Sequence, residues 1–202
     1  MIRAPLQPGD THSAGYITNV YTGSFNLARR HSQNWVASAD YVWTDCLGGN
    51  LELYARWFLY QRYDLQLLPT SPLVNELSSP DGAAPRLLRN RANLSTSWSG
   101  RRFGFGLDTY FFDSRQLPRQ EWATQGSNHI SSFWELDAYL QADLGRWLLP
   151  KDSKLGLQGQ IRVNNLFDSP PPRYANDPSG AGVQPYGDWR GRVYSISVTA
   201  KY

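Results

Sequence analysis

The side chains best suited to covalent chemistry lie around His129, because Ser127, Ser131 and Ser132 are its near neighbours in the sequence. A histidine that takes the proton of a serine hydroxyl activates it as a nucleophile for hydrolysis. The surrounding residues lack the Gly-x-Ser-x-Gly pattern that presents such a serine on a sharp turn. A solitary histidine beside serines is more often ordinary loop chemistry, so the sequence predicts no enzyme and no catalytic residue.

Metal-binding and redox groups are sparse in this chain. Its 202 residues include three histidines and a single cysteine, Cys46. One cysteine excludes an internal disulfide, and the histidines are too dispersed in the sequence to indicate a metal-ligand cluster. We therefore expect no metal and no cofactor, and we interpret Cys46 as a turn residue.

The composition excludes two classes of protein. The net charge is only +3, and the 20 basic residues are scattered without the stripe that follows a phosphate backbone, so we expect no nucleic-acid partner. The mean hydropathy of −0.52 leaves no run of about 18 apolar residues for a membrane helix. Eight Trp and 12 Tyr suit either the aromatic belts of a membrane barrel or a sugar-binding surface.

The elements that must position these residues show a period of two. In each of seven segments, one set of alternating positions is mainly apolar and the other is polar or charged, which predicts strands with two unlike faces. Each segment has about ten residues, the length of a tilted membrane strand. The segments are Trp35–Thr44, Leu51–Tyr60, Arg91–Trp98, Arg102–Phe111, Trp134–Gln141, Leu155–Asn164 and Tyr194–Tyr202. We expect a weaker strand over Tyr16–Tyr21 and an irregular N-terminal segment over residues 1–15.

The connections alternate between short and long. Short ones fall near Thr44–Gly49, Ser99–Arg101 and Gly145–Ser153, and long ones over Arg62–Arg86, Asp113–Asn128 and Asp168–Trp189. This asymmetry is typical of outer-membrane barrels. Residues 16–202 are therefore predicted to be all-β, an antiparallel up-and-down transmembrane β-barrel portion of about seven or eight strands, with short periplasmic turns and long outer loops. Two alternatives stay open: a small independent barrel, porin-like or a hydrolase, and a soluble β-sandwich that binds sugars.

A family resemblance rests on the last third of the chain. Residues 162–174 read Arg-Val-Asn-Asn-Leu-Phe-Asp-Ser-Pro-Pro-Pro-Arg-Tyr and contain Asn165, Leu166, Phe167 and Asp168, and they are followed by Gly191, Arg192 and Tyr194. This arrangement resembles the C-terminal β-barrel part of TonB-dependent receptors, which are outer-membrane importers. The alternating Tyr194, Ile196, Val198, Ala200 and Tyr202 look like the signal that the barrel assembly machinery reads.

The resemblance implies a place in the outer membrane of a Gram-negative bacterium and a part in the energised uptake of a scarce solute, such as a ferric siderophore. It implies contact with outer-membrane lipid, lipopolysaccharide and the barrel assembly machinery, and with the TonB complex only through N-terminal parts that these 202 residues lack. Family barrels close about 22 strands, so we expect a fragment.

We predict two sets of functional side chains, one that contacts the solute and one that lies inside the barrel. Aromatic and Arg side chains dominate recognition, so the ligand-contact candidates in the outer loops are Arg119, Trp122, Arg173, Tyr174, Tyr186 and Trp189. On the polar face we expect Arg56, Arg91 and Arg162 to interact with acids such as Glu52, Asp108, Glu135 and Asp137.

Overall fold

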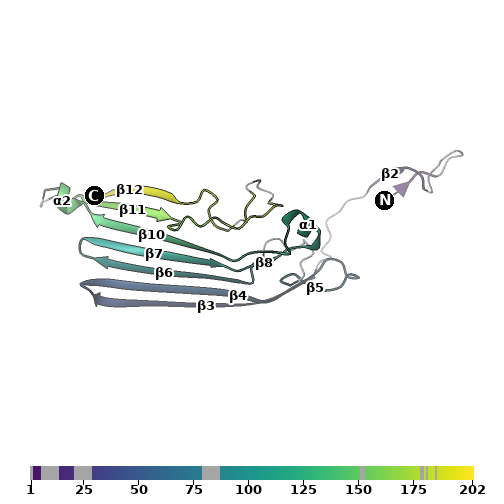
Figure 1. Cartoon of the computed structure of the whole chain (residues 1–202), viewed down its shortest axis with the longest axis horizontal. Coiled ribbons are helices and arrows are strands. Elements are labelled where there is room, and N and C mark those ends of the chain that lie inside the picture. The colour runs from purple at the N-terminus through teal and green to yellow at the C-terminus, as the bar shows by residue number, and fades with distance from the viewer. Residues whose placement is uncertain are drawn as a thin grey trace.

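Seven long strands build one antiparallel sheet in the computed structural model, which describes residues 2–5, 14–20, 29–78, 87–150, 153–177, 180, 182–184 and 186–202. The strands are β3 (Arg29–Cys46), β4 (Gly49–Gln66), β6 (Asn90–Gly100), β7 (Phe103–Phe112), β10 (Phe133–Asp143), β11 (Gly156–Asn164) and β12 (Val193–Lys201). Each pairs with the next long strand of the sequence, which gives an up-and-down meander (Figure 1). The short β5 (Val74–Asn75) adds an eighth strand beside β4. The predicted all-β, antiparallel class is confirmed.

The sheet is open in the part of the chain that the structure describes. Its edges are β3 and β12, and each has one neighbouring strand. The two edges are unequal, with 18 residues in β3 and 9 in β12. Open edges present unpaired backbone N–H and C=O groups along their length.

The predicted strand positions are correct, but the first hairpin is longer than expected. β3 and β4 have 18 residues each. Their pairing continues beyond a β-bulge, at which the alternation of apolar and polar residues shifts by one position. Asn34 pairs with Tyr60 while Gln33 pairs with Arg62, which leaves Gln61 as the extra residue. A bulge of this kind moves every following side chain to the other face. For this reason, Arg62 looked like the start of a loop.

The weaker strand expected over Tyr16–Tyr21 does not join the main sheet. β2 (Ile17–Asn19) instead pairs with β1 (Ile2–Arg3) in a separate two-stranded sheet, and Tyr21 lies outside the described residues. The segment 1–15, expected to be irregular, therefore contributes β1.

Short and long connections lie at opposite ends of the sheet, as the sequence predicts (Figure 1). The turns that join β3 to β4, β6 to β7 and β10 to β11 share one end, and the last of these contains α2 (Gly145–Leu148). The long segments share the other end, where η1 (Arg119–Glu121), α1 (Trp122–Gln125) and the β8 (Arg115–Gln116) and β9 (His129–Ile130) pair occur. Of the predicted long loops, residues 79–86, 178, 179, 181 and 185 lie outside the described part. Across the described ranges, no helix has both the length and the apolar character needed to span a bilayer.

The register of the strands brings the apolar positions together on one side. Leu94 of β6 lies opposite Ala55 of β4 and Thr109 of β7, and Ile161 of β11 lies opposite Leu140 and Ile196. We call this side the apolar face. Its large exposed side chains are Trp35, Tyr41, Trp43, Leu53, Trp57, Leu94, Phe103, Phe105, Leu107, Trp134, Leu140, Ile161, Tyr194, Ile196 and Val198. We call the opposite side the polar face.

The apolar face is uncovered by the described residues. The large side chains named above are between 37% and 78% exposed, and the sheets described besides the main one are two-stranded pairs. The buried hydrophobic cluster lies in the loops instead, where Leu117, Ile130 and Tyr174 pack together. A sandwich would bury alternate strand positions against a second sheet, and these positions are exposed.

Candidate functional site

The polar face carries charged side chains that are partly paired. Arg162 lies 3.7 Å from the carboxylate of Asp108, which also accepts a 2.6 Å hydrogen bond from the Ser95 hydroxyl. This is the pairing expected for Arg162. Arg91 instead lies 4.5 Å above the ring of Phe58. Arg56 has no carboxylate within ion-pair distance among the described residues.

A loop folds back over the polar face at the loop end of β10. A Cβ at Gly187 would lie 2.6 Å from the ring of Phe133. The backbone of Gly187 also has a φ of +93°, which residues with a side chain rarely adopt. For both reasons this position requires glycine. Next to it, the Asp188 amide donates to Glu135 Oε2 at 3.4 Å. Tyr186 stacks on Phe112 with 5.4 Å between ring centroids. The loop thereby brings side chains from residues 186–190 onto strands that lie more than 50 residues earlier in the chain.

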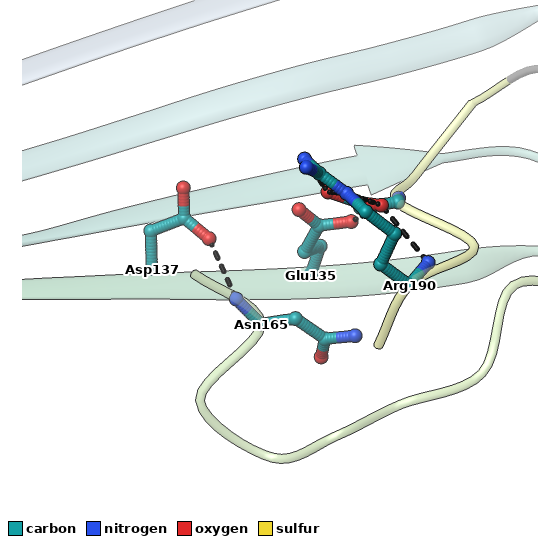
Figure 2. A network of polar contacts seen from close by, with 5 residues as sticks. Glu135, Asp137, Asn165 and Arg190 are labelled. Atoms are coloured by element: carbon teal, nitrogen blue, oxygen red, sulfur yellow. Dashed lines mark hydrogen bonds and ion pairs between the residues drawn. The ribbon is translucent and has the colours of Figure 1, made fainter. Parts of the chain in front are cut away.

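The fold-back borders an open cavity of about 660 Å³ on the polar face, which we call the acidic cavity. Three carboxylates and one guanidinium line it, together with aromatic rings. The lining residues are Tyr110, Phe112, Glu135, Asp137, Gly187, Asp188, Trp189 and Arg190. Figure 2 shows Glu135 and Asp137 projecting from the same side of β10, with Arg190 reaching in from the loop.

One of the three carboxylates is already neutralised. Arg190 holds Asp188 through both oxygens, with Nε at 2.9 and 3.0 Å and Nη2 at 2.6 Å. These hydrogen bonds hold the pKa of Asp188 below its usual range and raise the pKa of Arg190. Asp137 accepts the backbone N–H of Asn165 at 2.9 Å. With Asp188 and Arg190 cancelling, Glu135 and Asp137 leave the lining with a charge of −2.

A second cavity of about 310 Å³ adjoins the first and has the opposite charge, so we call it the basic cavity. Arg56 and Arg91 supply its charges. The full lining is Arg56, Phe58, Arg91, Ala92, Asn93, Tyr110 and Phe112. Tyr110 and Phe112 also line the acidic cavity. The two cavities therefore share an aromatic wall built by β7.

The structure separates the six ligand-contact candidates into two groups. Trp189 lines the acidic cavity and is 68% exposed, and Tyr186 lies against Phe112 at the same place. The other four, Arg119, Trp122, Arg173 and Tyr174, belong to a contact between two loops. The first group lies at the acidic cavity, through Trp189 in its lining and through the Phe112 ring on which Tyr186 stacks.

That contact joins segment 113–128 to segment 168–189. Gln125 donates from Nε2 to the carbonyl of Arg173 at 2.9 Å and accepts from the amide of Ala175 at 2.8 Å. Trp122 donates from its ring nitrogen to the carbonyl of Leu117, and Arg119 lies 5.9 Å from the Trp122 ring. Although they take part in this contact, the side chains of Arg119, Trp122 and Arg173 remain exposed to solvent.

Tyr174 is buried, with 7% of its surface exposed, and packs between the two loops. The guanidinium of Arg115 lies 4.7 Å over its ring, and its hydroxyl donates to Glu121 at 3.4 Å. Burial lowers the pKa of Arg115 and raises the pKa of Tyr174. The ring of Tyr174 therefore stabilises the loop contact and is not presented to a solute.

The Asn-Leu-Phe-Asp motif forms the turn that follows β11. Asn165 has a φ of +52° and is fully buried, and its side-chain amide exchanges two 2.8 Å hydrogen bonds with the backbone of Ser169. Leu166 donates its amide to Leu136 of β10, and Asp168 accepts the amide of Arg192 at 2.9 Å. Phe167 is exposed. The motif thus ties the start of the last loop to its end.

The last strand places its predicted assembly signal at an edge of the sheet. Tyr194, Ile196 and Val198 are exposed on the apolar face of β12, Ala200 follows the same alternation, and Tyr202 is fully exposed after the strand. One edge of β12 pairs with β11, which leaves the other edge free among the described residues.

The hydrogen bonds of His129 are local and stabilise the turn that precedes β9. Its Nδ1 lies 2.9 Å from Asn128 Oδ1 and 3.3 Å from Ser127 Oγ, while that hydroxyl also bonds the backbone of His129. Among the described residues no carboxylate contacts the ring, so the orienting acid of a catalytic triad is not found there. Within the same ranges, no group of three His, Cys, Asp or Glu residues is arranged to hold a metal ion.

Sequence reasoning identified Glu135 and Asp137 as inward acids but not the cavity in which they lie. The only local signal for the fold-back is Gly187, whose positive φ cannot be recognised from residue type alone. Comparison with known proteins adds no further identification, since no family model, curated protein or solved structure matches this chain.

Proposed function

We propose that this chain forms part of the wall of an outer-membrane β-barrel that imports a solute, in the manner of a TonB-dependent receptor. The observation that carries the proposal is the apolar face, which continues over seven strands and carries large exposed side chains on each of them. Exposed apolar patches on soluble monomers rarely exceed a few hundred Å². In a bilayer the same side chains face acyl tails, and this placement removes the cost of hydrating them.

Two rows of aromatic rings on the apolar face support a membrane location. Near the turn end, Trp43, Trp98 and Phe105 follow one another across adjacent strands with Leu51 between the first two. Near the loop end, Trp57, Ala92, Phe111 and Trp134 form a second row. On β6 the rows are six residues apart, or about 20 Å at ~3.3 Å per residue. Barrel girdles flank an apolar band about 25 Å tall.

The polar face provides the inner surface of such a wall. Its charged residues lie on the side away from the apolar face, and both cavity linings include Phe112, the last residue of β7 at the loop end. A solute arriving through the outer loops therefore meets the exposed Trp189 of the acidic cavity first. The role is transport and not catalysis, with outer-membrane lipid, lipopolysaccharide and the barrel assembly machinery as partners. Energy from TonB reaches it through other parts of the receptor.

Unequal edges favour a wall section over a small independent barrel. Closing the sheet on itself would pair the 18 residues of β3 with the 9 residues of β12 and leave half of β3 unpaired. Unpaired N–H and C=O groups along a strand edge are open to pairing with a further strand. Additional strands of matching length at both edges would pair them.

A pair of substitutions on opposite faces of β6 tests the proposal. Leu94→Arg places a charge on the apolar face between the two aromatic rows, and Ser97→Arg places the same charge on the polar face. An arginine facing the bilayer midplane costs about 2–4 kcal/mol. We expect the full chain to float with lipid vesicles as wild type and as Ser97→Arg, and to lose most of this association as Leu94→Arg. Equal flotation of the two variants, or a chain that stays in solution without lipid, would contradict the proposal.

A further inference from the structure

The two adjoining cavities have opposite charge and share one wall. Glu135 and Asp137 give the acidic cavity a charge of −2, and Arg56 and Arg91 give the basic cavity a charge of +2. Tyr110 and Phe112 line both. A ligand that fills both cavities must therefore carry a positive group at one end, a negative group at the other and a body that tolerates aromatic contact.

The acidic side has carboxylate oxygens available to a ligand. Glu135 accepts a 3.4 Å hydrogen bond from the Asp188 amide at Oε2, and this bond uses one of its two oxygens. Asp137 uses Oδ1 for the Asn165 amide. The one guanidinium in the lining, on Arg190, donates from Nε to both oxygens of Asp188 and from Nη2 to Oδ2. This lining therefore has no cationic side chain left to balance Glu135 and Asp137. The ammonium group of a ligand would supply this positive charge.

The basic side has guanidinium groups available in the same way. Arg91 contacts the ring of Phe58, and this contact leaves its N–H edge free to bind an anion. Neither Arg56 nor Arg91 has an acidic partner within 4.0 Å among the described residues. A carboxylate accepts two parallel hydrogen bonds from a guanidinium, so it fits this cavity.

The spacing of the strands sets the length of the ligand. Glu135 lies opposite Tyr110 on β7, and Tyr110 lies opposite Asn93 on β6, so the acidic and basic sides are two or three strands apart. At about 4.8 Å per strand, the charges are separated by roughly 10–14 Å. An extended peptide covers about 3.3 Å per residue, so three or four residues span this distance.

We infer that the two cavities together bind a short linear peptide of three or four residues with free termini. Its ammonium group lies beside Glu135 and Asp137, its carboxylate beside Arg56 and Arg91, and its middle against Tyr110 and Phe112. An anionic metal complex would be repelled on the acidic side, and a neutral sugar would leave both charges unbalanced. The inference rests on the proposed function, because it names the solute class that the wall admits.

Calorimetric titration of the full chain in detergent tests the inference without any substitution. The probes are tetraalanine, its N-acetylated form and its C-terminal amide. Each modification removes one terminal charge and leaves the length of the peptide unchanged. We expect free tetraalanine to bind and each modified peptide to bind at least tenfold more weakly. Equal affinity of the three peptides, or no binding by a chain with the strand content of the native protein, overturns the inference.

Two substitutions assign each terminus to its cavity. Glu135→Gln removes a charge from the acidic cavity, and Arg56→Gln removes one from the basic cavity. In Glu135→Gln the penalty for N-acetylation shrinks while the penalty for amidation persists, and Arg56→Gln shows the reverse. Glu52→Gln and Arg102→Gln remove the same charges outside both linings, so they retain both penalties. The opposite assignment of termini, or an equal effect of all four substitutions, contradicts the inference.

The outcome is distinguishable from failure of the proposed function. If the chain associates with vesicles but binds no peptide, the proposed membrane location is supported and the inferred solute class is wrong. If the chain binds peptide with the expected pattern but stays out of the bilayer, the site exists and its role in membrane transport fails.

Discussion

The carboxylate of Asp137 in β10 accepts the backbone amide of Asn165, 28 residues later, at 2.9 Å (Figure 2). This hydrogen bond lies where β11 ends and the last loop begins. It holds Asp137, which is 8% exposed, at the floor of the acidic cavity and fixes the turn from which the loop returns. The geometry of the cavity thus depends on the same contact as the end of a strand.

Removing the acceptor at Asp137 should destabilise the sheet at this point. In Asp137→Ala the buried amide of Asn165 loses its partner, which costs about 1–3 kcal/mol. Asp137→Asn keeps an oxygen at the same position, so we expect a smaller loss. Denaturant titration of the detergent-refolded chain measures both free energies of unfolding. Equal stability of wild type and Asp137→Ala would show that the hydrogen bond contributes nothing.

The backbone at Asn165 provides a second prediction. Its φ of +52° is tolerated by asparagine and glycine but strained for alanine. Both Asn165→Gly and Asn165→Ala lose the two hydrogen bonds to Ser169. We expect Ala to be less stable than Gly by about 1 kcal/mol, measured by the same titration. An alanine variant as stable as the glycine variant would refute a left-handed backbone at this turn.

Gly106 should be intolerant of a side chain because Tyr139 covers it. A Cβ at this position would collide with the Tyr139 ring on the polar face. Gly106→Val is expected to lower the free energy of unfolding by about 1–3 kcal/mol through overpacking. In a Tyr139→Leu background the same change should cost less, so the double-mutant cycle gives a non-zero coupling energy. Additive effects would mean that the two residues do not touch.

The fold-back loop should loosen in acid. Because Arg190 depresses the pKa of Asp188 in the folded protein, this ion pair stabilises the loop above the ordinary carboxyl pKa and is lost as the pH falls through the depressed value. We expect hydrogen exchange at the amides of Asp188 and Arg190 to be protected at pH 7 and to lose protection in strong acid, after correction for intrinsic rates. Asp188→Asn should show weak protection at both pH values. Protection that is independent of pH in the wild type would count against this pair.

Alternation was sufficient to predict the sheet because strand side chains alternate strictly between two faces. Leu94 and Ile161 were assigned correctly from their neighbours in the sequence, and the register confirms both. The extension of β4 past Tyr60 was missed because the bulge at Gln61 reverses the parity. A strand prediction that relies on strict alternation ends where a bulge shifts the alternation by one residue.

The candidate site was less predictable because it depends on contacts between distant segments. Glu135 and Asp188 are 53 residues apart, and only the folded loop brings them together. Tyr174 and Trp189 are both aromatic loop residues, yet one is buried between loops and the other lines a cavity. Residue type alone does not distinguish these two environments.

A nitroxide scan along β6 tests the central claim, that the apolar face contacts lipid, most directly. Cys46 is the only cysteine, so in a Cys46→Ser background each position from 92 to 98 is replaced by cysteine in turn and labelled in the vesicle-bound chain. We predict that labels at 92, 94, 96 and 98 are accessible to lipid-dissolved oxygen, and that labels at 93, 95 and 97 are accessible to a water-soluble nickel complex. Accessibility to the nickel complex at all seven positions, without a period of two, would contradict the account.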